Sequence, residues 1–329
     1  MAAQRARKFA LLAGQSAAGG EVIDQLHDDV HRLAVTYPQQ PLATVLGGLV
    51  DTQDSIFTLL EARQRPQRAR QLYFLGAVVG GLLAKASHDL ADPHAAMAQA
   101  RTAFLCADNA DHDGLRAWLR GQQSLIAYWA GRPREAARYA ESGGQYAAGA
   151  GNTTAVWLPM NEARAWAALG DAERTRAAIE RAEHAWDTVH SDDLDELGGI
   201  CTFSRPRQLY YAADALVWLP AEASHAERYS TAAVEAYGDT ADPDWAFGDQ
   251  AGSHTALAIA RVAHGEFDGA AEALAPVLAL PAEQRINGIV ASARRVHQVL
   301  SRAPGAAGVS DLREEIEVFM TIPMNALPR

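Results

Sequence analysis

Apolar residues recur along most of this chain at intervals of three and four positions, the spacing of an amphipathic α-helix. In the stretch Glu21–Tyr37 one helical face carries Val22, Leu26, Val30 and Leu33. Pro38 then ends the pattern, as a helix-breaking residue should. Alternating runs rich in Val, Ile and Thr, which indicate half-buried strands, are almost absent. The pattern predicts an all-helical chain.

A second pattern is a sequence repeat that recurs with variations. Each copy has a helical run with bulky residues, a glycine next to a charged residue, and an Ala-rich second helix. The repeat reads AYWAGRPREAARYAE at 127–141, AWAALGDAERTRAAIERAE at 165–183 and ARVAHGEFDGAAEAL at 260–274. A divergent copy at 215–233 has Pro220 in place of the turn glycine. Such units are typical of tetratricopeptide (TPR) repeats. We expect an all-α, TPR-like right-handed superhelical solenoid of antiparallel helix pairs.

The turns between paired helices are predicted at Asp92, Gly131, Gly170, Ala221 and Gly265. The longest interval precedes Ala221, and its excess lies largely in 191–204, an acidic, glycine-containing loop. We predict a flexible lead-in over 1–20, a helical repeat domain over 21–302, and a C-terminal capping helix and tail over 303–329.

Further helices are expected outside the sequence repeat, at 21–37, 41–63, 69–90, 94–109, 285–302 and 310–320. The third of these contains Gly76, Gly80 and Gly81. Glycine in a helix costs roughly 1 kcal/mol relative to alanine, but it lets a neighbouring helix approach closely. We therefore expect close helix packing at these three positions.

The formal net charge of −11 disfavours broad contact with phosphate backbones or anionic lipid. Neither nucleic acid nor a membrane is therefore expected as a direct partner. The two cysteines, Cys106 and Cys201, are far apart and form no CxxC pattern, which argues against a disulfide framework or a Cys-ligated zinc site. No apolar run approaches the ~20 residues that cross a bilayer. We expect a cytoplasmic protein.

Enzyme motifs are absent from the sequence. HExxH, GxSxG, GxxxxGK[ST] and GxGxxG do not occur, so the common metalloprotease, hydrolase and nucleotide-binding patterns give no support. Two acidic clusters do occur, Asp192, Asp193, Asp195 and Glu196 in one and Asp239, Asp242 and Asp244 in the other. Acidic runs in loops are usually solvated. We predict no catalytic residue and no cofactor.

Two segments have partial metal-binding spacing. Asn109 to Gly114 matches the first half of a calcium loop, but the position that needs a bidentate glutamate is Arg120. We therefore expect an interhelix turn in which Asp113 caps the next helix. His27 and His31 lie one helical turn apart without a third ligand, which indicates a solvated face. No metal site is predicted.

Placing the predicted turns at the turn position of a TPR unit identifies the residues that face the concave groove. Aromatic rings offer a large contact area, and an arginine can pair with a carboxylate through two hydrogen bonds. The predicted ligand-binding residues are Trp118, Tyr128, Trp157, Arg164, Tyr211 and Trp218. They suit a peptide or an aromatic, acidic small molecule. The alternative is that these rings pack between adjacent units, and a one-residue register shift would substitute Trp129 or Trp166.

The stretch from Gly80 to Glu141 resembles the C-terminal region of actinobacterial XRE-family (helix-turn-helix) transcriptional regulators. The resemblance extends from about Val30 to Val299. In that family a DNA-binding domain precedes a TPR-like region that senses a ligand or partner. This sequence has no counterpart of the DNA-binding domain and no basic recognition helix, so it corresponds to either a truncated regulator or a stand-alone relative.

The resemblance implies a ligand- or peptide-sensing regulatory domain that binds in its concave groove and signals by conformational change. The change would pass to an attached domain or to a dimer partner, with helices 21–90 as the candidate homodimer surface. A constitutive protein–protein interaction scaffold is the alternative, and an enzyme on a helical-repeat scaffold is a minor one.

Overall fold

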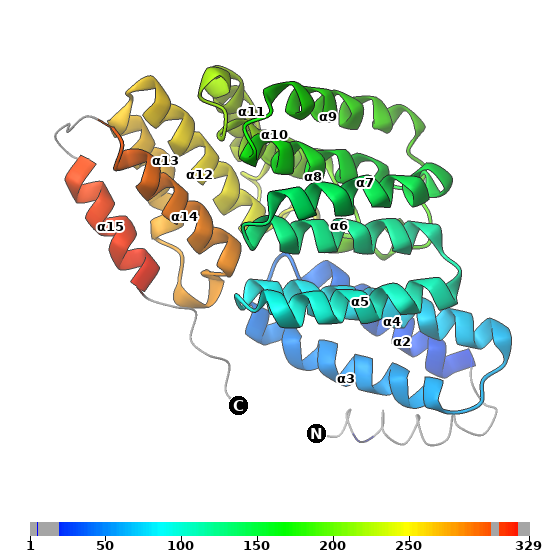
Figure 1. Ribbon diagram of the computed structural model, residues 1–329. Helices are drawn as coiled ribbons and strands as arrows, with labels where there is room; N and C mark the ends of the chain where they lie inside the picture. Colours follow the sequence, from blue (N-terminus) through cyan, green and yellow to red (C-terminus); the bar gives the residue numbers. More distant parts are fainter. Residues whose placement is uncertain (1–4, 6–19, 304–308, 322–329) are drawn as a thin grey trace.

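The computed structural model describes residue 5 and residues 20–303 and 309–321. These residues form fourteen α-helices, α2 to α15, connected in places by short 3₁₀ turns, and they contain no strand (Figure 1). The predicted all-α fold class is confirmed. Within the same ranges, no helix combines the length and apolar character needed to cross a membrane. Nearly all of the lead-in predicted at 1–20 lies outside the described residues.

Ten of the helices form successive pairs. The pairs are α4 (Pro66–Asp89) with α5 (Pro93–Ala110), α6 (Asp113–Trp129) with α7 (Pro133–Ala150), α8 (Thr154–Ala168) with α9 (Ala172–Ala185), α10 (Arg205–Leu216) with α11 (Ala223–Ala236), and α12 (Phe247–His264) with α13 (Phe267–Leu278). The flanking helices are α2 (Gly20–Thr36), α3 (Leu42–Glu61), α14 (Asn287–Leu300) and α15 (Val309–Thr321). The helix expected at 69–90 begins earlier, because Pro66 starts its first turn.

Three of the predicted turns contain a glycine in the left-handed region. The φ angles are +71° at Gly131, +78° at Gly170 and +79° at Gly265. A Cβ at any of the three would meet nothing within 4 Å, so the backbone angle alone requires glycine there. Asp92 caps α5 by accepting hydrogen bonds from two backbone amides, as predicted for a helix start.

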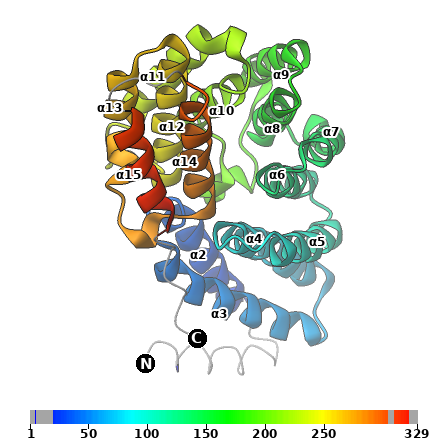
Figure 2. The same ribbon diagram turned by 60° about the vertical axis from the view of Figure 1, so that its left-hand side comes forward.

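The first helices of the pairs form an inner curve, with α5, α7 and α9 outside it (Figure 2). Along this curve, aromatic rings pack onto glycines of the neighbouring inner helix. A Cβ added at Gly81 would lie 2.1 Å from the Trp118 ring, and one at Gly121 would lie 2.5 Å from the Trp157 ring. The close approach predicted at Gly81 is therefore confirmed. The alternative that aromatics pack between adjacent units also holds for these two indoles.

The acidic loop between α9 and α10 folds into the molecule. Leu194, Leu197 and Phe203 are buried, and the His31 Nδ1 atom lies 3.1 Å from the Leu197 carbonyl oxygen. Asp195 is buried as well, and its carboxylate accepts hydrogen bonds from the backbone amide and the hydroxyl of Thr153. The expectation of a solvated acidic run is therefore wrong for Asp195, whose pKa is raised by burial despite those hydrogen bonds.

The two ends of the helical array contact each other. The Phe247 amide at the start of α12 donates a 3.2 Å hydrogen bond to the Pro38 carbonyl, which follows α2. Gly199, in the inserted loop, packs against the backbone of Ala34 and Val35 in α2. The inner curve is thus closed across its open side by the inserted loop and by the turn after α2.

The turn glycines and the glycines at close helix contacts should differ in how much stability an alanine substitution costs. Gly131→Ala forces a left-handed alanine and should lower the free energy of unfolding by roughly 1 kcal/mol. Gly81→Ala gains helix propensity but drives a methyl group into the rigid Trp118 ring, and it should cost about 3 kcal/mol. Urea unfolding of both variants measures the difference. An equal or larger loss at Gly131 would contradict the close packing at Gly81.

Candidate functional site

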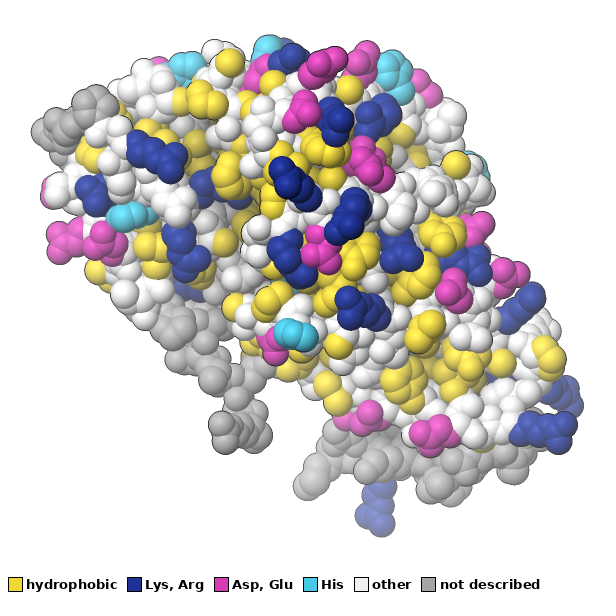
Figure 3. Space-filling model, in the orientation of Figure 1, with side chains coloured by type: hydrophobic (Ala, Val, Ile, Leu, Met, Phe, Trp, Pro, Cys, Tyr) yellow, Lys and Arg dark blue, Asp and Glu magenta, His cyan; other side chains and the backbone are white. Residues whose placement is uncertain are grey.

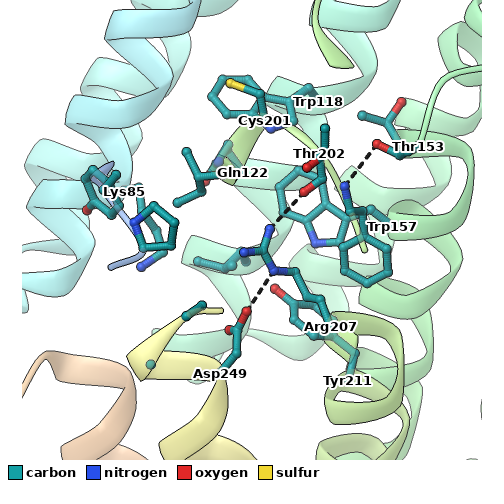
Figure 4. Close-up of a pocket in the computed structure, with 18 of the residues that line it drawn as sticks. Lys85, Trp118, Gln122, Thr153, Trp157, Cys201, Thr202, Arg207, Tyr211 and Asp249 are labelled. Carbon is teal, nitrogen blue, oxygen red and sulfur yellow. Dashed lines mark hydrogen bonds and ion pairs between the residues drawn. The ribbon is translucent and has the colours of Figure 1, made fainter. Parts of the chain in front are cut away.

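A pocket of about 80 Å³ lies where the inner helices meet the inserted loop and the start of α12. We call it the central pocket. Figure 4 shows its walls, with Lys85 of α4 on one side and Arg207 of α10 across from it. The side chains that shape it are Tyr37, Lys85, Asp89, Trp118, Gln122, Trp157, Phe203, Arg207, Tyr211 and Asp249. Residues from both ends of the array therefore form one site.

The cations of the central pocket are paired with carboxylates of the chain. Arg207 Nε donates to Asp249 Oδ2 at 2.7 Å, and its Nη1 donates to the Thr202 carbonyl at 2.9 Å. Burial is the largest single effect and opposes the charge of Arg207, but Asp249, Tyr237 and Tyr211 together outweigh it and raise the pKa of the guanidinium. On the opposite wall, Lys85 Nζ donates to Asp89 at 2.6 Å. The pocket thus presents fixed dipoles with balanced formal charge.

Aromatic rings form the remaining wall. Phe203 lies between two predicted ligand-binding residues, with ring centroids 6.3 Å from Trp157 and 5.2 Å from Tyr211. The pair with Trp157 is stacked, and the pair with Tyr211 is edge-on, both of which are favoured geometries. This wall offers flat apolar area next to the hydrogen-bonding groups of Arg207.

Gln122 carries the clearest sign of a missing partner. Its side chain lines the central pocket, is 2% exposed, and has an Oε1 atom without a hydrogen-bond partner among the described residues. A buried acceptor left unpaired costs about 1–3 kcal/mol. A bound molecule with an N–H or O–H group would recover that cost.

The six residues predicted to bind ligand fall into three places. Trp118, Trp157 and Tyr211 line the central pocket. Tyr128 and Trp218 line a second hollow near the turns that end α6 and α10. The separation follows from helix geometry, because residues seven apart share a face but lie about 10 Å apart along the axis.

Arg164 lies between the two hollows, with 1% of its surface exposed. Its Nε donates to Asp214 Oδ2 at 2.7 Å, and its guanidinium stacks on Tyr211 at 4.3 Å from the ring centroid. The carboxylate opposite Arg164 is therefore the chain's own Asp214. Contact of Arg164 with a ligand remains a prediction.

Asp214 is shared by several helices. Arg295 of α14 donates to Asp214 Oδ1 at 2.8 Å, and the Tyr128 hydroxyl of α6 donates to Oδ2 at 3.1 Å. Burial by itself would raise the pKa of Asp214, but Arg164 and Arg295 together lower it below its usual value. The carboxylate therefore remains charged inside the protein.

Sequence reasoning missed Gln122 and Arg207. Each lies four residues from a predicted ligand-binding residue of its own helix, Gln122 after Trp118 and Arg207 before Tyr211, so helical spacing from those residues could have indicated them. No pattern in the sequence indicates Asp249, because its role depends on the return of α12 to the centre of the molecule.

The segment with partial calcium-loop spacing is an interhelix turn. Arg116 pairs with Asp108 at 2.8 Å and with Asp113 at 2.6 Å. The predicted cap is wrong in one respect: His112 caps α6 through its Nδ1, and Asp113 is the first helical residue. Across the described ranges, no group of three or more His, Cys, Asp or Glu side chains is placed to hold a metal ion.

His88 of α4 makes the stability of this region sensitive to acid. Burial is the main cause that lowers its pKa from 6.5 to about 4, and Lys85 and Arg164 act in the same direction. Between those two values, the unfolded chain binds a proton at this histidine and the folded chain does not. The folded state therefore loses stability as pH falls from 6.5 towards 4.

His88→Leu should remove this acid sensitivity. From pH 7 to pH 4.5, the wild-type free energy of unfolding should fall by up to roughly 3 kcal/mol more than that of the variant. Denaturant unfolding at several pH values measures the two slopes. His94→Leu, at an exposed position of α5, is the control and should keep the wild-type slope. Identical slopes for wild type and His88→Leu would show that His88 is protonated in the folded chain.

Comparison with known protein-family models and with curated proteins finds no match to this chain. The resemblance to XRE-family regulators therefore remains a prediction.

Proposed function

We propose that this chain is a TPR-like ligand-sensing domain of a regulator, and that its central pocket holds a small organic molecule. One observation carries the proposal: the pocket is lined by helices from both ends of the array and contains the unpartnered Gln122 Oε1. The resemblance to XRE-family regulators supplies the regulatory context. A cytoplasmic setting belongs to the same proposal.

The lining defines the chemistry of the ligand. Trp157, Phe203 and Tyr211 suit a flat or apolar body, and Gln122 Oε1 needs a hydrogen-bond donor. The cations of the pocket already have carboxylate partners in Asp89 and Asp249, so the ligand needs no net charge. A neutral or weakly polar aromatic molecule with one donor group satisfies all these contacts.

The signalling step follows from the position of the pocket. A ligand that contacts both α6 and the start of α12 binds most tightly when these two elements lie at the distance that fits the ligand. Arg207 links the inserted loop to α12 through Thr202 and Asp249, so this side chain would transmit the change. Ligand binding would thereby select one curvature of the helical array and alter the surface offered to an attached domain or second copy.

A protein-binding scaffold is the second candidate, and the outer surface favours it. Lys and Arg side chains gather over α5 to α9 in Figure 3, although the net charge of the chain is −11. Arg101, Arg134 and Arg138 are exposed on the outer helices α5 and α7. An acidic segment of a partner protein would fit this face.

Native mass spectrometry of the protein purified from its own host separates the two candidates. We expect a co-purifying small molecule that mild denaturation releases. A bare chain in complex with another protein would contradict the sensor proposal and favour the scaffold.

Gln122→Met should change stability and ligand retention in opposite directions. The substitution replaces an unpartnered buried amide with an apolar side chain of similar size, so the ligand-free protein should become more stable by about 1 kcal/mol. The same change removes the acceptor for the ligand, so the ligand-bound fraction in native mass spectra should fall at least about tenfold.

Gln123→Met is the matched control on the same helix. Gln123 is equally buried, but its Oε1 accepts a 2.8 Å hydrogen bond from Arg120. Its substitution should lower stability by about 1–3 kcal/mol and leave ligand retention unchanged. Equal retention in wild type and Gln122→Met would remove Gln122 from the site.

A further inference from the structure

A second hollow, which we call the edge pocket, lies where α14 passes the turn ends of α6, α8 and α10. Its space is about 320 Å³, and its main lining side chains are Tyr128, Trp129, Pro133, Trp218, Arg294 and Arg295. None of these side chains lines the central pocket. The edge pocket is thus a separate concavity at the border of the helical array.

The charges beside the edge pocket do not balance. Arg164 and Arg295 both pair with Asp214, and no other ion pair to either arginine is found among the described residues. Arg294 is exposed in the lining and has no ion pair within the same ranges. Arg164 and Arg295 therefore share one carboxylate, and Arg294 adds a third guanidinium group beside them, in a chain whose overall charge is strongly negative.

This excess positive charge is partly desolvated. Arg295 is only 12% exposed at its side chain, and its stacking on Trp218, 4.2 Å from guanidinium carbon to ring centroid, covers one of its faces. An unneutralised charge in such a place is costly in free energy. An anion bound in the pocket would lower that cost and gain charge-assisted hydrogen bonds.

The aromatic side of the edge pocket is held in position before anything binds. Trp218 is 39% exposed, and its Nε1 donates a 2.9 Å hydrogen bond to the Tyr128 hydroxyl. That hydroxyl also accepts from Arg295 at 3.0 Å and donates to Asp214. All hydrogen-bonding positions of the hydroxyl are used, so the indole ring is fixed and loses little entropy when a ligand stacks on it.

We propose that the edge pocket binds a flat aromatic carboxylate. The carboxylate pairs with the guanidinium groups of Arg294 and Arg295, and the ring stacks against Trp218. This site takes an anion, whereas the ligand proposed for the central pocket needs no charge. Its existence does not depend on the proposed function of the central pocket.

Isothermal titration calorimetry with 2-naphthoate and with its neutral counterpart 2-naphthamide tests the proposal. We expect 2-naphthoate to bind and 2-naphthamide to bind at least about tenfold more weakly, because the amide lacks the charge that Arg294 and Arg295 recognise. Binding of 2-naphthoate should weaken as salt is raised, since Arg294 is exposed. No heat from 2-naphthoate, or equal affinity for the two compounds, would overturn the proposal.

Variants then show which pocket the bound 2-naphthoate occupies. Arg294→Gln and Trp218→Ala change exposed side chains and should each weaken 2-naphthoate binding roughly tenfold, with thermal melting as the check on folding. Arg101→Gln removes the same charge from α5 and should leave binding unchanged. Wild-type affinity in both edge variants overturns the proposal. A loss confined to Gln122→Met places the acid in the central pocket, which overturns the edge site and supports the proposed sensor.

Discussion

The way α6, α8, α10 and α14 meet depends on one buried carboxylate, that of Asp214 in α10. Side chains from α6, α8 and α14 all bind to it, through Tyr128, Arg164 and Arg295. A charge taken out of water is tolerated only where its partners have good geometry and each remaining hydrogen-bonding position is used. The carboxylate therefore requires these helices to meet at one point, and it sets the position at which α14 crosses the turn ends of the pairs.

Arg164 connects the two pockets physically. Its guanidinium stacks on Tyr211, which lines the central pocket, and on Tyr128, which lines the edge pocket, with centroid distances of 4.3 and 4.4 Å. A displacement of Arg295 towards a bound anion would weaken its bond to Asp214 and leave Arg164 as the principal partner of that carboxylate. The two sites thus share one charged network, which is the physical condition for coupling between them.

The aromatic residues of the inner helices serve packing and the pocket at once. Trp118 and Trp157 occupy space that Gly81 and Gly121 leave open, and the same two residues line the central pocket. Close packing onto glycine limits the rotamers of each indole, so the pocket wall is rigid. The inserted loop is connected to α12 through Arg207, which donates one hydrogen bond to the Thr202 carbonyl and one to Asp249.

The sequence by itself determined the helices, the paired arrangement and the turn glycines, because helical periodicity and the φ angles of Gly131, Gly170 and Gly265 are local properties. It also identified the inner face, since residues seven apart share a side of a helix. Only the tertiary structure decided how deeply each residue is buried. Arg164 is buried and pairs with Asp214, and Asp195 is buried and accepts a hydrogen bond from the Thr153 hydroxyl. Pairings between residues distant in the chain leave no periodic pattern in the sequence, so only the structure showed that α12 completes the pocket at one end of the aromatic face and α14 completes the pocket at the other.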